Sequence, residues 1–115
     1  MGRKARQLAE GAFQTDTLMV SAISFWEIAM LVRAGRLGLA VPVAEWRQAT
    51  FQRGIQEDPV TGQVGIVAGE LAGLPGDPAG RIITATALVR GCSLLTADER
   101  ILGWSGRLAL HDARL

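Results

Sequence analysis

The sequence predicts a single α/β domain with a parallel sheet, and two observations indicate this class. Stretches with apolar residues at helical spacing alternate with short apolar runs of the buried-strand type along the chain. Strands that alternate with helices are typical of layered α/β folds. The length of 115 residues suits one domain that buries about two thirds of its unfolded surface, so residues 1–115 are expected to form a single domain.

The composition indicates a globular cytoplasmic protein with no membrane association. Hydrophobic residues make up 49% of the chain and charged residues 20%, and no apolar run approaches the roughly 18 to 20 residues that a membrane span requires. The basic start is followed by Gln7 and Glu10 without the apolar core of a signal peptide. A single cysteine, Cys92, cannot form an internal disulfide and is interpreted as a small buried residue. The net charge of +1 neither favours nor excludes nucleic acid.

The N-terminal third shows a helix, a strand and a second helix. Residues 3–13 carry apolar residues at helical spacing, and 18–23 form a short apolar run that predicts a buried strand. Ser24 and Glu27 match a capping box at the start of the next helix, because the serine hydroxyl and the acid three residues later can bond each other's backbone N–H groups. Gly35 is the expected end of that helix.

The middle of the chain continues with two helices around a short strand. Pro42 suits the first turn of a helix that ends near Gly54, and residues 55–57 follow as a candidate strand. Thr61 is a candidate N-cap for a helix over about 62–73. Four glycines in that range predict the least stable helix of the domain, since each costs up to about 1 kcal/mol relative to alanine.

The C-terminal third holds the most apolar helix. Residues 79–90 are almost wholly apolar and end before Gly91, which predicts a buried helix. Residues 92–96 resemble a strand of a parallel sheet, and Asp98 is the candidate cap of a short helix that runs through Leu102. A final strand is expected near 108–110.

Several motifs, in their order and spacing, resemble a VapC-type PIN domain, the toxin ribonuclease of type II toxin–antitoxin systems. They are the segment from Ser21 to Ala29, Gly35-Arg36-Leu37, Trp46, Gly76-Asp77-Pro78, Ala85-Thr86-Ala87-Leu88 and the segment from Leu95 to Arg100. The resemblance runs from about Gly2 to the C-terminus. It implies a PIN-like three-layer sandwich with a parallel sheet.

The resemblance also implies a metal-dependent endoribonuclease. In the family, acids at the carboxyl ends of parallel strands hold Mg²⁺ or Mn²⁺, and the ion activates a water against an RNA phosphodiester. Glu27 and Asp98 match the family's acids position by position and are the expected catalytic metal ligands. Asp77 is a weaker candidate ligand, because in relatives it shapes its loop, and Arg81 is a candidate contact to the substrate phosphate. From the residues alone, Glu27 and Asp98 have the alternative of helix capping.

Two departures from the family pattern concern the acids. Relatives open with a hydrophobic strand that ends in Asp-Thr or Asp-Ser, and residues 1–115 contain no match to it. We therefore expect a chain truncated at its N-terminus, and Asp16 is interpreted as a surface turn residue rather than a substitute. Relatives also carry an aspartate where this chain has Gly80.

The missing first strand is central in the family's sheet, so its neighbours are expected to have unpaired backbone groups. A longer gene product, a strand from another chain or a rearranged homodimer would each fill the gap.

Two functions remain open. The first is a VapC-like toxin that cleaves RNA with impaired efficiency and binds a cognate VapB-like antitoxin. The alternative is a non-catalytic PIN remnant that acts by association through an apolar surface near Phe25, Trp26, Met30 and Trp46. Both tryptophans are interpreted as packing residues rather than platforms for bases. His111 is expected at the surface without a role.

Overall fold

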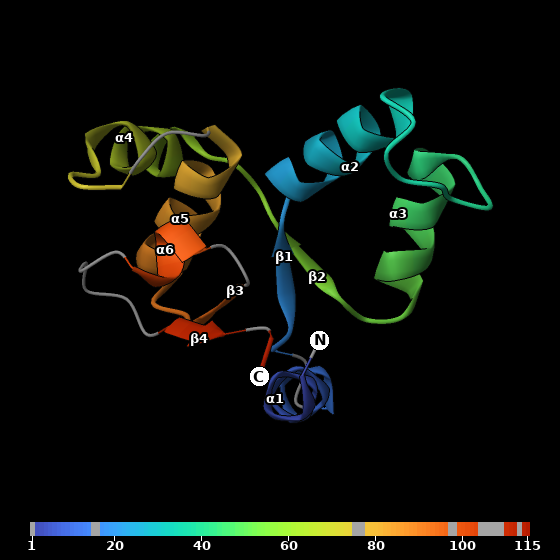
Figure 1. Ribbon diagram of the computed structural model, residues 1–115, viewed down its shortest axis with the longest axis horizontal. Helices are drawn as coiled ribbons and strands as arrows, with labels where there is room; N and C mark the ends of the chain where they lie inside the picture. Colours follow the sequence, from blue (N-terminus) through green and yellow to red (C-terminus); the bar gives the residue numbers. More distant parts are fainter. Residues whose placement is uncertain (1, 15–16, 75–77, 97–98, 104–109, 113) are drawn as a thin grey trace.

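Helices and short parallel strands alternate along the chain, which confirms the predicted α/β class (Figure 1). The structure is a computed structural model and describes residues 2–14, 17–74, 78–96, 99–103, 110–112 and 114–115. The elements in this described part are α1 (Arg3–Gln14), β1 (Met19–Ser21), α2 (Ile23–Arg33), α3 (Val43–Gln52), β2 (Gln56–Asp58), α4 (Gly62–Glu70), α5 (Pro78–Arg90), β3 (Leu94–Thr96), α6 (Glu99–Leu102) and β4 (Leu110–Asp112).

The described strands form two separate parallel pairs instead of one continuous sheet. β1 pairs with β2, with Ser21 opposite Asp58, and β3 pairs with β4, with Thr96 opposite Asp112. Figure 1 shows β1 and β2 in the middle of the molecule and β3 and β4 to their left, below α5. β1 and β3 therefore each have a strand partner on one side only within the described residues.

The hydrophobic core lies between α4 and α5. Val64 and Ala68 of α4 pack on the fully buried Ala85 of α5. Partly buried side chains surround this cluster: Val67, Leu71, Ile82 and Val89. The prediction that Thr61 caps α4 is confirmed, because its hydroxyl accepts a hydrogen bond of 3.2 Å from the N–H of Val64. The prediction that α5 is buried is also confirmed by its five buried residues.

Helices α2 and α3 are held by an arginine between aromatic rings. The Arg47 guanidinium lies 4.6 Å from the ring centroid of Phe51 and 5.7 Å from that of Phe25. Phe25 also meets Trp46 edge to face at 5.9 Å between centroids. Arg47 Nε and Nη2 donate to the two carboxylate oxygens of Glu57 in β2, at 2.8 and 3.0 Å. Trp46 is therefore a packing residue, and Arg47 ties α3 to the first strand pair.

Neither α2 nor α3 contains a fully buried residue. Trp26 and Met30 of α2 are each 47% exposed. None of the described helices has the length and apolar character needed to cross a membrane.

We expect Val64→Ala to lower the free energy of unfolding by about 2 kcal/mol, because it removes buried methyl groups and leaves a cavity in the α4–α5 core. Val60→Ala is the matched control, since Val60 is 42% exposed just before α4. Urea unfolding followed by circular dichroism measures both. Equal effects of the two substitutions would contradict the placement of the core.

We expect the Arg47–Glu57 pair to contribute stability above about pH 4.5 and to lose it in acid. The hydrogen bond from Arg47 lowers the pKa of Glu57 below its ordinary value of 4.5. A carboxylate with a lowered pKa stabilises the fold when ionised, and this contribution disappears as the pH falls through the folded pKa. Wild-type protein should thus lose more stability than Glu57→Gln between about pH 6 and pH 3 in urea unfolding.

The control for this comparison is Glu45→Gln, which neutralises an exposed acid in the first turn of the same helix as Arg47. Its stability should follow the wild-type pH dependence. A Glu57→Gln protein with that same dependence would show that the ion pair does not contribute.

Candidate functional site

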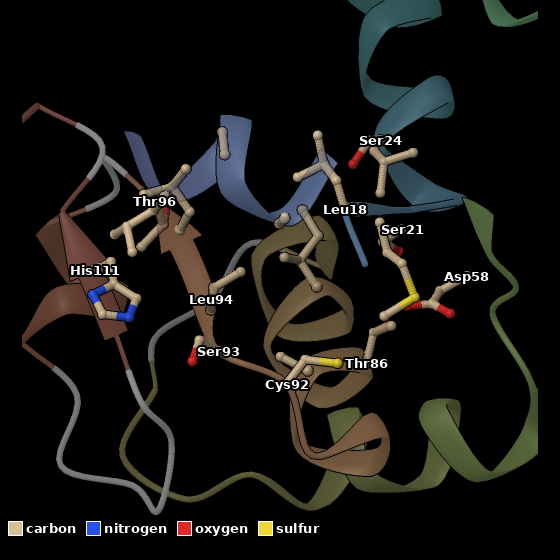
Figure 2. A pocket seen from close by; sticks show the side chains of 18 of the residues that line it. Leu18, Ser21, Ser24, Asp58, Thr86, Cys92, Ser93, Leu94, Thr96 and His111 are labelled. Atoms are coloured by element: carbon tan, nitrogen blue, oxygen red, sulfur yellow. The ribbon is translucent and has the colours of Figure 1, made fainter. Parts of the chain in front are cut away.

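A cavity of about 720 Å³ lies between the two strand pairs. Its wall includes residues of β1 and β3, the apolar side chains of α1 and α5, and the first turns of α2. Figure 2 shows Leu94 and His111 on one side of this cavity and Ser21 and Asp58 on the other, with Ser24 near the start of α2. Glu27, a predicted metal ligand, lines this cavity, so the cavity is the candidate functional site.

Glu27 lies in the second turn of α2 and is partly buried. It reaches the cavity because α2 begins directly after β1. The Ala22 N–H extends the strand pairing by donating to the Asp58 carbonyl at 2.8 Å, and the Ser21 hydroxyl accepts from the N–H of Ile23 at 3.4 Å. The chain is therefore helical from Ile23.

The predicted capping box of Ser24 and Glu27 is wrong. Ala22 is the N-cap residue, with helical backbone angles and no side-chain cap, and Ser24 lies inside the helix. The backbone N–H of Ile23 is bonded to the Ser21 hydroxyl and the helix is already formed at Ile23, so Ser24 is too late in the chain to be the N-cap residue. The alternative interpretation, that Glu27 only completes a capping box, is therefore not supported.

Asp58 is a buried acid of the cavity wall that the sequence patterns did not single out. Its side chain is 10% exposed, and Oδ1 lies 3.2 Å from Arg90 Nε at the end of α5. The signal was available, because Asp58 directly follows the predicted strand 55–57 and an acid at a carboxyl strand end is a candidate site residue. Its ion pair with Arg90 links the first strand pair to α5.

The other predicted metal ligands cannot be placed beside Glu27. Asp77 and Asp98 lie outside the described residues. Within the described part of the chain, no group of three or more His, Cys, Asp or Glu residues could hold a metal ion. Gly80, which has no side chain to offer an ion, lines the cavity, and its carbonyl accepts from the Thr84 hydroxyl at 2.8 Å. The described residues alone therefore do not fit a divalent ion, which prefers several carboxylate oxygens.

The hydrogen bonds of Arg81 within the chain do not support its predicted contact to a substrate phosphate. Its guanidinium donates to four backbone carbonyls around the end of α4: Ala68 at 3.0 Å, Gly69 at 3.3 Å, Leu71 at 2.9 Å and Leu74 at 2.6 Å. A helix C-terminus leaves such carbonyls without helical partners, and a planar guanidinium can bond several at once. Arg81 therefore anchors the α4 end to α5.

His111, which was expected at the surface without a role, is a partly buried residue of β4 at the cavity wall. The neighbouring residue, Asp112, accepts hydrogen bonds within the C-terminal turn. The Arg114 guanidinium and backbone N–H donate to the Asp112 carboxylate, and these hydrogen bonds lower the pKa of Asp112 to about 2. Cys92 also lines the cavity and is partly rather than fully buried.

Comparisons with known proteins agree with the resemblance noted in the sequence. Residues 1–103 match the family model of the PIN domain. Over 87 residues the chain is 40% identical to a curated protein named Ribonuclease VapC22 from Mycobacterium tuberculosis (strain ATCC 25618 / H37Rv). That alignment covers 75% of this chain and 66% of the relative, so the match spans just under two thirds of the relative's length. No solved structure gives a significant match.

We expect Arg81→Met to lower the free energy of unfolding by about 2–4 kcal/mol, because hydrogen bonds from a charged group contribute roughly 1.5–3 kcal/mol each and are not additive. Arg81→Lys should not rescue it, since one ammonium cannot reach the four carbonyls. Urea unfolding is the measurement, with Arg53→Met at an exposed arginine as control. Unchanged stability in Arg81→Met, together with weaker RNA binding, would instead support the phosphate contact.

Proposed function

This chain belongs to the PIN-domain family, and on that basis we propose that it is a VapC-like toxin ribonuclease whose RNA cleavage is impaired. The 40% identity to a protein named Ribonuclease VapC22 supports the toxin ribonuclease class. The observation that carries the proposal is the position of Glu27, an acid that matches the family pattern and lines the cavity between the strand pairs. RNA is the proposed substrate, and a VapB-like antitoxin the proposed partner.

A divalent ion, Mg²⁺ or Mn²⁺, supplies an activated water and stabilises charge on the phosphate when it is bound. We propose Glu27 and Asp98 as its ligands, with Asp77 as a weaker third. The glycine at position 80 leaves this set one carboxylate short of the family pattern, and the described residues do not complete it. With so few carboxylates, an ion keeps most of its waters and is held weakly. Because of this shortage, we expect RNA cleavage to be impaired.

A non-catalytic PIN remnant that acts by association is the second candidate. The exposed apolar side chains on α2 favour it: Trp26, Met30 and Leu31 are 47%, 47% and 38% exposed. Large apolar side chains gathered at a surface are typical of protein interaction sites. Their partner would be an antitoxin segment or a second protomer of a homodimer.

A cytoplasmic location belongs to the same proposal. RNA targets are found there, and an unpaired cysteine such as Cys92 suits a reducing compartment.

The decisive test is Mn²⁺ binding by isothermal titration calorimetry. We expect weak binding, with a dissociation constant on the order of 0.1–1 mM, that is lost in Glu27→Ala and in Asp98→Ala. Glu45→Ala, an exposed acid on α3, is the matched control and should bind as the wild type does. Circular dichroism confirms that each variant folds.

Binding that disappears with Glu27 and Asp98 leads to a cleavage assay on a labelled single-stranded RNA with and without Mn²⁺. Slow, Mn²⁺-dependent cleavage that Glu27→Ala abolishes would support the ribonuclease. No binding at millimolar Mn²⁺ and no cleavage would reject it in favour of the remnant. Binding that survives in both alanine variants would show that the ion occupies a different site.

A further inference from the structure

Helix α2, which carries Glu27, is not held in place by a buried apolar face. None of its residues is fully buried, and Trp26 and Met30 are each 47% exposed. Helices in proteins usually owe most of their stability to the packing of such a face. The position of Glu27 therefore depends strongly on the polar contacts at the start of α2.

Asp58 contacts α2 and α5 through two different groups. Its backbone carbonyl accepts a hydrogen bond of 2.8 Å from the N–H of Ala22, the residue directly before α2. Its carboxylate Oδ1 lies 3.2 Å from Nε of Arg90, the last residue of α5. Figure 2 shows Asp58 beside Ser21, the residue opposite it in the first strand pair. One buried residue thus joins the start of α2 to the end of α5.

The α5 side of this link has a firm support. Helix α5 packs on α4 through the hydrophobic core around Ala85, and Arg90 extends from the end of this helix. Nη2 of Arg90 also donates to Sδ of Met19 at 3.6 Å, so the same guanidinium contacts both strands of the first pair. Arg90 therefore connects the core to the strands from which α2 begins.

Stability alone does not explain an acid at position 58. Asp58 is 7% exposed, and the cost of burying a carboxylate can cancel most of what an ion pair gains. An apolar side chain would avoid this cost, and aspartate is also disfavoured in strands. What an ion pair adds is direction, because its strength depends on the placement of the two charged groups. The pair of Asp58 with Arg90 is therefore suited to fixing a geometry.

We infer that Asp58 is a positioning residue of the candidate site: with Arg90 it holds α2, and therefore Glu27, at a fixed place relative to α5. Its carboxylate needs no contact with a substrate or an ion for this role. The importance of Glu27 rests on the proposed function, whereas the placement of α2 does not. The two parts of the inference are therefore tested by separate measurements.

The first test measures the placement of α2 without any metal ion. Nitroxide labels on Arg33→Cys in α2 and Glu70→Cys in α4, both at exposed positions, are introduced into a Cys92→Ser protein. Double electron–electron resonance then gives the distribution of distances between the two helices. We expect this distribution to be at least about twofold broader in Asp58→Asn and in Arg90→Gln, because α2 loses its link to α5.

Two control variants separate positioning from a general loss of stability. Glu57→Gln removes the neighbouring ion pair of β2, which ties this strand to α3 through Arg47, and should leave the distribution unchanged. Arg90→Lys keeps a cation opposite Asp58 and should restore most of the narrow distribution, because the attraction between opposite charges does not require the guanidinium.

The second test measures the effect on Glu27 by calorimetric titration with Mn²⁺. Asp58→Asn and Arg90→Gln should each bind Mn²⁺ at least about fivefold more weakly than the wild type. The double variant should bind no more weakly than either single variant, because both remove the same link. Glu57→Gln should stay within about twofold of the wild type.

Distances in Asp58→Asn and Arg90→Gln that match the parent would overturn the inference, as would equal broadening in Glu57→Gln. Broader distances with unchanged Mn²⁺ affinity would overturn the part that concerns Glu27. If the wild type does not bind Mn²⁺, the proposed function fails, and the distances alone decide whether Asp58 places α2. Should Asp58→Asn fail to fold, Arg90→Gln decides, since the Arg90 side chain is 51% exposed.

Discussion

The burial of α5 is the constraint on which the rest of the structure depends. Its buried residues are all small: Ala79, Thr84, Ala85, Thr86 and Ala87. The two threonine hydroxyls donate to carbonyls one turn earlier, at 2.8 and 2.7 Å, so the helix buries them without unpaired polar atoms. Small side chains let α4 approach closely and leave room on the other side for the cavity between the strand pairs. Arg81 at the start of α5 and Arg90 at its end then attach the helix to α4 and to β2.

Periodicity in the sequence was enough to predict the elements, because each helix or strand is encoded by local apolar spacing. The Thr61 cap, the buried α5 and the strand after it followed from such local signals. What could not be predicted depends on contacts between distant segments. Helix α2 starts early because the backbone of Ala22 bonds to Asp58, and the role of Arg81 arises from carbonyls 7 to 13 residues away.

The candidate site shows the same division. Glu27 could be identified from a motif, and the structure places it at the cavity. Asp58 and His111 enter the cavity wall through strand pairing, which no single segment encodes. The buried carboxylate of this wall, Asp58, already forms an ion pair with Arg90 within the chain. A site built for a hard cation would instead direct several carboxylates at one point, and Gly80 cannot contribute one.

The two strands of each pair lie within one continuous stretch of the chain. The first pair and its helices occupy residues 19–58, the second pair and its helices occupy 62–112, and a short connection around Pro59 separates them. The Arg47–Glu57 pair lies wholly within the first stretch and the Arg81 bonds within the second. Segments whose polar contacts are mostly internal tend to form and open as cooperative units. Local opening of this protein is therefore expected at the boundary between the two stretches, where it must break the ion pair between Asp58 and Arg90 that joins them.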